Sequence, residues 1–482
     1  MEEKSRTGII SNLAWKFGER ITAQVVTLIV TIILARLLEP EHYGVIAIVM
    51  VFISIANVFV LDGLGNSLIQ KKDVDELDYS TVLVANLVMT FVLYILLYFS
   101  APFISSFYGE GYEILTPVLR VLSFRIILSG INSVQQAYVA KKMIFQKFFW
   151  ATLFGTVFSA IAGIVVAYKG GGVWALVVQY LSNTTIDTLV LFISINKYPG
   201  LRFSFKRFRT LFAYGIRILG TGLLIHLFVE MRALIIGKIY SRSELAYYDK
   251  GKLFPNVLVA NISTSIAAVL FPKLANEQND RARIKKITQY SVRFSSYLMS
   301  PIMLGFAAVA YPFVRFVLTE KWLPSVPLMR LFCIVFLFNP IHTSNSQAIK
   351  AIGRSDVYLK LEIIKKSIEL VTLIITMNIS VQAIVIGMAI CTTGFTFVNA
   401  YPNKKFIDYS YKEQMLDIIP NILMGVIMSV IVYLVGMIQL DYRLLLLIQI
   451  IVGVALYIGM SYFTGNPEYK YIINYLRKRN TY

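Results

Sequence analysis

Long apolar segments separated by short polar breaks recur along the whole chain. A helix of about 20 apolar residues crosses the roughly 30 Å hydrocarbon core of a bilayer, and the segments are of that length. The pattern therefore predicts an all-α, polytopic membrane protein with about 14 transmembrane helices. The expected spans are 14–38, 43–66, 80–104, 115–138, 148–168, 173–195, 211–236, 253–271, 293–318, 328–349, 358–378, 382–402, 418–439 and 443–463.

The composition agrees with this pattern. Of the 482 residues, 57% are hydrophobic and only 15% are charged, and the mean hydropathy is +0.67. A soluble fold could not cover so much apolar surface, because soluble domains carry about 25% charged residues. The two cysteines, Cys333 and Cys391, both lie in apolar segments, which argues against a disulfide framework or a cysteine zinc site. No nucleotide-binding motif is present, and no cofactor is expected.

Basic residues gather in alternate breaks between the expected spans, for example in 141–147, 197–209 and 281–286. The opposite breaks are poorer in lysine and arginine, apart from the break that carries Lys238, Arg242, Lys250 and Lys252. Basic loops stay on the cytoplasmic side, so both termini are predicted to be cytoplasmic. This distribution also explains the net charge of +19 without a nucleic-acid partner.

Two stretches hint at an internal repeat. The end of the first span reads "ARLLEPEHYGVIA" and the end of the seventh reads "GKIYSRSELAYYDKG". The echo predicts a six-helix lobe over 1–205, which includes a basic cytoplasmic linker, and a second six-helix lobe over 206–405. Two additional helices and a basic cytoplasmic tail follow in 406–482. Repeated halves are typical of alternating-access transporters.

Three consecutive glycines, Gly170 to Gly172, allow two interpretations. A phosphate-binding loop would need a Gly-Lys-Ser/Thr ending, but the next residues are Val173, Trp174 and Ala175. A tight turn between two membrane helices needs only the glycines, so the hairpin is favoured.

Several separated stretches resemble one family. They are "WKFGERITAQVVTLIVTIILARLLEPEHYGVIAIV", "GLGNSLIQKKDVDELDYSTV", "GGGVWALVVQ", "IIGKIYSRSELAYYDKGKLFPNV" and "FPKLANEQND". The chain is similar over essentially its full length to the polysaccharide exporter family. This family holds Wzx-type and teichuronic-acid-exporter-like flippases of the multidrug/oligosaccharidyl-lipid/polysaccharide flippase superfamily.

The resemblance implies a carrier rather than an enzyme, placed in the bacterial cytoplasmic membrane. Its substrate would be an oligosaccharide linked to undecaprenyl diphosphate, moved from the inner to the outer leaflet by alternating access of a cavity between two lobes. The product would serve O-antigen, capsule, exopolysaccharide or teichuronic acid export. Candidate partners are the polysaccharide polymerase and the chain-length machinery.

A diphosphate needs cations, and a charge inside an apolar span is costly unless it meets a partner or water. The candidate cavity cations are therefore Arg20, Arg125, Arg217, Lys365 and Lys366. Alternatives stay open for four of them. Arg20 lies near the membrane interface, Arg217 is close enough to the cytoplasmic end to snorkel, and the lysine pair fits a helix that protrudes from the bilayer equally well.

Interior carboxylates and one histidine are candidates for binding a coupling proton or sodium ion, or for pairing with the cations. They are Asp62, Asp187, His226, Glu230, Glu362 and Glu369. His226 and Glu230 share a helix face, and so do Glu362 and Glu369 with the lysine pair. The alternatives are a helix-end turn at Asp62 and a structural hydrogen bond at His226 and Glu230.

Two other functions stand as alternatives to the carrier. A membrane polymerase or ligase of lipid-linked sugars would need a sizeable outer loop, whereas "EPEHY" and "SSFYGEGYE" are short. A cation-coupled drug antiporter of the same superfamily would share the architecture, and composition does not distinguish it; only the quoted stretches favour the polysaccharide branch.

Overall fold

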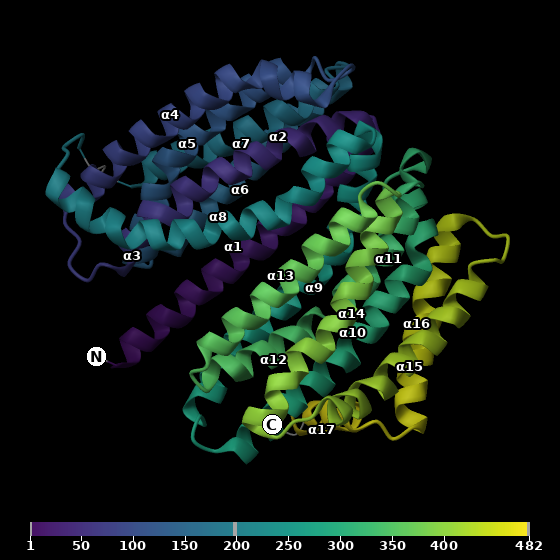
Figure 1. The fold of residues 1–482 in the computed structure, drawn as a ribbon. Helices are drawn as coiled ribbons and strands as arrows, with labels where there is room; N and C mark the ends of the chain where they lie inside the picture. Colours follow the sequence, from purple (N-terminus) through teal and green to yellow (C-terminus); the bar gives the residue numbers. More distant parts are fainter. Residues whose placement is uncertain (1, 196–199, 480–482) are drawn as a thin grey trace. The chain divides into compact units, whose positions relative to one another are not determined.

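The computed structural model describes residues 2–195 and 200–479, and these residues form helices joined by short connections (Figure 1). The chain divides into two compact units, Met1–Ala246 and Tyr247–Tyr482. The division falls within one long helix, α9 (Arg242–Asn276).

The described part of the first unit is built from nine elements and the beginning of α9. They are α1 (Glu2–Leu37), α2 (Pro40–Val58), the π-helical η1 (Phe59–Gly65), α3 (Asn66–Gln70), α4 (Glu76–Tyr108), α5 (Leu115–Lys142), α6 (Phe145–Tyr168), α7 (Val173–Ser194) and α8 (Phe205–Ile239).

The second unit holds the rest of α9 and the remaining helices. They are α10 (Arg281–Val317), the short η2 (Glu320–Trp322), α11 (Ser325–Leu337), α12 (Asn339–Ala351), α13 (Ser355–Thr376), α14 (Val381–Ile407), α15 (Tyr411–Val435), α16 (Tyr442–Phe463) and α17 (Pro467–Arg479).

The prediction of an all-α polytopic membrane protein is confirmed. Within the described residues, 12 helical stretches are long and apolar enough to cross a membrane. The two other predicted spans, 211–236 and 358–378, coincide with α8 and α13. α13 carries charged residues along most of its length, and α8 has charges within its apolar part. The count of 14 spans therefore stays a prediction.

The predicted outer loop around Lys238 and Arg242 is wrong. α8 continues to Ile239 and α9 begins at Arg242, so only Tyr240 and Ser241 separate the two helices. The spans were predicted from apolar residues alone. A helix can continue beyond the hydrocarbon core with charged residues facing water. A prediction from apolar residues alone therefore places the end of such a helix too early.

The glycine turn joins α6 to α7, as predicted. Gly170 and Gly172 have φ of 77° and 53°, a region that favours glycine. The Gly171 N–H donates to the Val166 carbonyl at 3.0 Å and closes the end of α6. The two helices then pack through small residues that recur every fourth position on α6 and are buried, namely Ala151, Gly155, Ser159, Gly163 and Ala167. Such spacing lets membrane helices approach closely.

Asp78 fixes the first turn of α4 to α8. Its side chain is fully buried, and its carboxylate lies 2.6 Å from Lys71 Nζ and 2.9 Å from Arg207 Nη1. The Asp75 backbone N–H also donates to it, at 3.2 Å, as part of a capping box. The network ties the segment before α4 to the beginning of α8.

Asp78→Asn is expected to destabilise the protein by about 2 kcal/mol, because a buried carboxylate with two cationic partners loses its charge. Lys71 and Arg207 are one-third exposed, which limits the cost by leaving them access to water. The midpoint of thermal unfolding in detergent should fall by about 5 °C. Asp75→Asn is the control, because Asp75 is half exposed and asparagine still caps a helix. An equal fall in both variants would contradict this role for Asp78.

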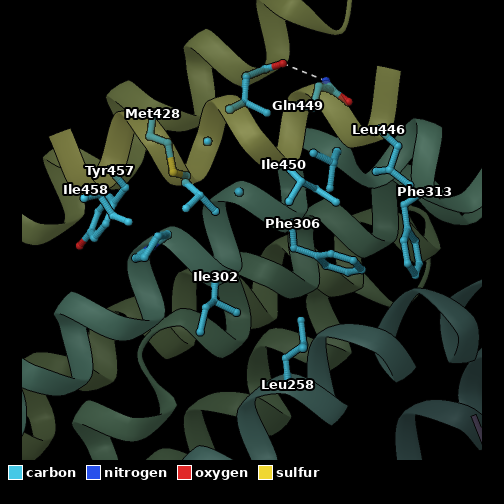
Figure 2. A pocket seen from close by; sticks show the side chains of 16 residues that line it. Leu258, Ile302, Phe306, Phe313, Met428, Leu446, Gln449, Ile450, Tyr457 and Ile458 are labelled. Atoms are coloured by element: carbon cyan, nitrogen blue, oxygen red, sulfur yellow. Dashed lines mark hydrogen bonds between the residues drawn. The ribbon is translucent and has the colours of Figure 1, made fainter. Parts of the chain in front are cut away.

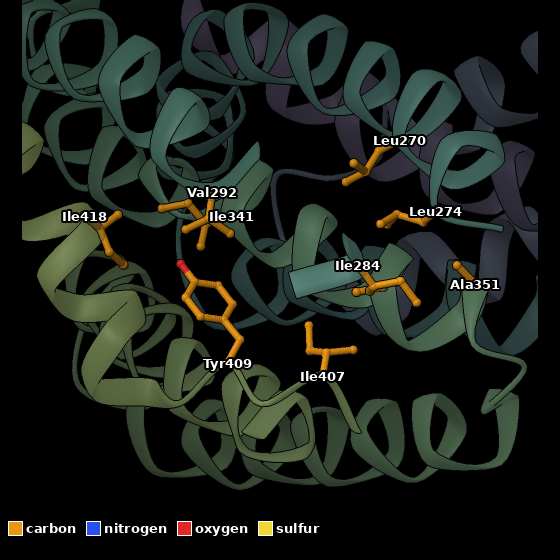
Figure 3. Packing of buried hydrophobic residues seen from close by; sticks show 10 residues of the cluster. Leu270, Leu274, Ile284, Val292, Ile341, Ala351, Ile407, Tyr409 and Ile418 are labelled. Atoms are coloured by element: carbon orange, nitrogen blue, oxygen red, sulfur yellow. The ribbon is translucent and has the colours of Figure 1, made fainter. Parts of the chain in front are cut away.

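In the second unit, a cluster of buried apolar residues joins α9, α10, α12, α14 and α15 (Figure 3). Tyr409 lies within it and donates its hydroxyl to Asp417 at 2.8 Å. Beside the cluster, Arg293 donates to the buried Glu468 of α17 at 2.8 Å. This ion pair fixes α17, a short C-terminal helix that the pattern of apolar residues did not predict.

Candidate functional site

Arg125 lies in the middle of α5, within the first unit. Its Nε donates to Thr184 Oγ1 of α7 at 2.7 Å, and its Nη1 lies 3.8 Å from Met50 Sδ of α2. The guanidinium also lies 5.7 Å from the Tyr180 ring centroid. Within the described part of the chain, no carboxylate forms an ion pair with it. A guanidinium has five N–H donors, so this cation retains donors for an anionic group.

Asp187 occupies the same α5–α7 interface about one turn further along α7. Its Oδ2 accepts a hydrogen bond of 2.8 Å from Asn132 Nδ2, and its Oδ1 is buried without a hydrogen bond to any described residue. Asn132 also donates to Thr188 Oγ1 at 3.3 Å and accepts from Gln136. A carboxylate with one unpartnered oxygen inside an apolar bundle is suited to binding a proton or a small cation.

The structure therefore brings Arg125 and Asp187 to one interface without pairing them. We call the polar side chains of this interface the α5–α7 polar seam; they are Arg125, Asn132, Gln135, Gln136, Thr184, Asp187 and Thr188.

The other candidates of the first unit are distributed over α1, η1 and α8. Arg20 is exposed on α1. Glu230 accepts a hydrogen bond of 3.2 Å from Ser54 of α2, and no hydrogen bond to His226 is present. The backbone of Asp62 lies in η1, a π-helical stretch of the kind that often marks functional sites. The side chains of Asp62 and Arg217 lie outside the described residues.

The four candidates of the second unit form two ion pairs along α13. Lys365 Nζ lies 2.5 Å from Glu362 Oε1, and Lys366 Nζ lies 3.0 Å from Glu369 Oε2. Each pair has the three-residue spacing that places side chains on neighbouring turns. Within each pair the two opposite charges neutralise each other. The Lys365 side chain is the most buried of the four, with 12% of its surface exposed.

The uncharged members of the seam and one buried histidine were not among the candidates predicted from the sequence. Asn132 and Thr184 belong to "INSVQQ" and "NTTID", where clusters of amides and hydroxyls interrupt apolar spans. A search limited to charged residues leaves these amide and hydroxyl side chains out. His342 on α12 has a buried Nε2 without a hydrogen bond to the described residues. The polar run "HTSNSQ" was the available signal.

An apolar cavity of about 510 Å³ lies in the second unit among α9, α10, α15 and α16 (Figure 2). Ile302, Phe306 and Met428 point into it. Gln449 is the one amide in its wall, and it donates to the Val432 carbonyl at 2.8 Å. The cavity therefore suits a hydrocarbon chain rather than a sugar.

Among the described residues, no group of three or more histidine, cysteine, aspartate or glutamate side chains could hold a metal ion. The first unit offers a cation and a carboxylate in the α5–α7 polar seam. The second unit offers, by itself, an apolar cavity.

Two solved structures share this fold. The lipid II flippase MurJ in an inward closed conformation matches with a TM-score of 0.75 at 16% identity, over 96% of this chain and 100% of that chain. A multidrug resistance MATE family transporter in an inward-facing conformation matches with a TM-score of 0.60 at 14% identity, over 85% of this chain and 95% of that chain. At these identities the likeness concerns the fold alone.

Sequence relatives point to one family. The teichuronic acid biosynthesis protein TuaB of Bacillus subtilis (strain 168) is 25% identical over 300 residues, which span 62% of each chain. The lipopolysaccharide biosynthesis protein WzxC of Escherichia coli (strain K12) is 22% identical over 368 residues, 75% of this chain and 73% of that one. The family described as polysaccharide biosynthesis protein matches residues 33–327. The chain therefore belongs to this polysaccharide biosynthesis and export family.

Proposed function

We propose that the protein is a flippase for oligosaccharides linked to undecaprenyl diphosphate. It moves these repeat units from the inner to the outer leaflet of the bacterial cytoplasmic membrane, for export of a cell-surface polysaccharide. Membership of the polysaccharide biosynthesis family carries this proposal. The names of the two relatives, which concern teichuronic acid and lipopolysaccharide, support a lipid-linked sugar as substrate.

The apolar cavity and Arg125 suit different parts of such a substrate. The apolar cavity of the second unit suits the polyprenyl chain. The free donors of Arg125 suit a diphosphate, because arginine binds phosphate oxygens through two parallel hydrogen bonds. Arg20, Arg217, Lys365 and Lys366 are the further cations of the proposal.

The proposed mechanism is alternating access, with a six-helix repeat in each half and two additional helices at the C-terminal end. Both termini lie in the cytoplasm in this scheme, as the distribution of basic residues predicts. A proton or sodium gradient drives transport through Asp187, with Asp62, His226, Glu230, Glu362 and Glu369 as alternative coupling groups. A polymerase and chain-length machinery would act on the product.

Asp187→Asn is expected to remove the dependence of transport on the ion gradient, because an amide cannot take up a proton. Its side chain keeps an oxygen that can accept from Asn132, so the seam should stay folded. The initial rate of transfer would be measured in vesicles with and without a proton gradient, and then a sodium gradient. Glu230→Gln is the matched comparison. A gradient response in Asp187→Asn equal to that of the unmodified protein would exclude Asp187 as the coupling group.

The function itself is tested by a leaflet-resolved assay of lipid-linked oligosaccharides in cells with and without the protein. Complete repeat units should accumulate on the cytoplasmic leaflet in depleted cells. Units that reach the outer leaflet but remain unpolymerised would instead indicate a polymerase or ligase. Unchanged units in both leaflets would refute the flippase, and the cation-coupled drug antiporter would take its place.

A further inference from the structure

A second apolar cavity lies in the first unit, between α4 and the beginning of α8. Its volume is about 510 Å³. Val84, Ala85, Val88 and Met89 form one wall on a single face of α4, and three phenylalanines form the other. Nearly all of its lining is apolar, and none of the predicted substrate-binding or ion-coupling residues contributes to it. It is therefore a site separate from those described above.

The three phenylalanines, Phe203, Phe208 and Phe212, form a continuous aromatic wall. Phe208 lies 5.8 Å from Phe203 and 5.2 Å from Phe212, measured between ring centroids. Phe208 also packs against the core around Leu83 and Leu211, which fixes its ring. Val88, across the cavity, is 60% exposed, so the cavity opens to the outside of the unit.

Hydrogen bonds hold the segment before α8 in place. Ser80 Oγ contacts the carbonyl of Arg202 at 2.6 Å and also the Arg202 N–H. The Ser204 N–H donates to Thr81 Oγ1 at 3.2 Å. Arg207 forms ion pairs with Asp75 and Asp78. The backbone that carries the phenylalanines is thus fixed on the first turns of α4.

Three further cations lie close in sequence to the phenylalanines of the cavity wall. Arg202, Lys206 and Arg209 are exposed, and their side chains form no ion pair among the described residues. Arg209 shares a helix face with Phe205 and Phe212, because it lies four residues after the first and three before the second. The positive-inside rule places this segment at the cytoplasmic surface, where the headgroups of anionic lipids lie.

We infer that this cavity binds one anionic phospholipid of the cytoplasmic leaflet. An acyl chain occupies the space between α4 and the phenylalanines, and the phosphate-containing headgroup lies against Lys206 and Arg209. Charge complementarity selects this occupant: the apolar cavity takes any hydrocarbon chain, but the three unpaired cations favour a headgroup with net negative charge. The site does not depend on which substrate the protein transports.

Binding is tested with a tryptophan reporter in the full-length protein. Phe212→Trp places the reporter in the cavity wall, and the protein without this substitution gives the background of its four native tryptophans. The protein is reconstituted in phosphatidylcholine vesicles that contain increasing fractions of brominated phosphatidylglycerol or brominated phosphatidylcholine. Half-maximal quenching should need about 30-fold less brominated phosphatidylglycerol, since each cation near the surface changes lipid affinity by about 5-fold. Equal quenching by both lipids would overturn the inference.

Two variants locate the effect. Lys206→Gln combined with Arg209→Gln should abolish most of the preference for phosphatidylglycerol and leave quenching by phosphatidylcholine unchanged. Lys404→Gln combined with Lys405→Gln removes the same charge from exposed positions of α14 and should change neither. Equal losses in both double variants would show a general surface-charge effect and overturn the site. Displacement of the phosphatidylglycerol by equimolar undecaprenyl phosphate would assign the cavity to the transported lipid and overturn the phospholipid assignment.

Discussion

Arg125→Ala is expected to reduce the initial rate of outward transfer by about 100-fold while the protein remains at its normal level in the membrane. Arg125 has one hydrogen bond of 2.7 Å to Thr184 and no carboxylate partner among the described residues. Hydrogen bonds from a charged group contribute about 1.5–3 kcal/mol each, and about 2.7 kcal/mol corresponds to a 100-fold change in rate. The leaflet-resolved assay measures the rate, and immunoblotting of membranes measures the level.

Little structural damage is expected from this substitution. Thr184 Oγ1 also lies 3.3 Å from the Tyr180 carbonyl, so its hydroxyl keeps a partner when the guanidinium is removed. Arg125→Lys should give an intermediate rate, because lysine retains the charge but lacks the planar fork. Arg120→Ala is the matched control on the same helix. Arg120 donates to the Tyr98 carbonyl at 3.1 Å and stacks on the Tyr98 ring, away from the seam. Full activity of Arg125→Ala would exclude it from the substrate site.

The position of Arg125 could be predicted from the sequence, but its surroundings could not. A single charged residue in an apolar run is recognisable in the sequence as a candidate functional residue, since burying a charge in lipid is costly. Its partner Thr184 lies 59 residues away, and the pairing depends on the relative rotation of α5 and α7. The same limit applies to Glu230. Helical spacing placed it beside His226, but its hydrogen bond goes to Ser54, which is 176 residues away.

In the fold, likewise, features set by neighbouring residues were predicted, whereas features that depend on residues distant in sequence were not. Length and apolarity predicted where the helices lie, because each backbone group of a membrane helix must be satisfied within its own segment. The π-helical stretch η1 and the C-terminal α17 were missed. α17 is fixed by a tertiary contact, the Arg293–Glu468 ion pair, that no local pattern encodes.

Gly44→Ala is expected to be the most destabilising of these substitutions, by about 3 kcal/mol. A Cβ on Gly44 would lie 2.0 Å from the carbonyl oxygen of Arg242 and 2.9 Å from its Cα. Both are backbone atoms, so no side-chain rotation relieves the clash, and α2 must move away from the beginning of α9. Thermal unfolding in detergent should show a midpoint lowered by about 8 °C.

Gly220→Ala is the control for this prediction, because a Cβ there meets nothing within 4 Å. It should leave the midpoint unchanged or raise it slightly, since alanine favours a helix over glycine. Arg242 also lies 3.4 Å from Glu41 and stacks on Tyr112, so the close approach fixes the beginning of α9 within the first unit. If Gly44→Ala unfolded at the same temperature as Gly220→Ala, the contact would be too adaptable to anchor this helix. A large fall would show that α9 is held where it leaves the first unit.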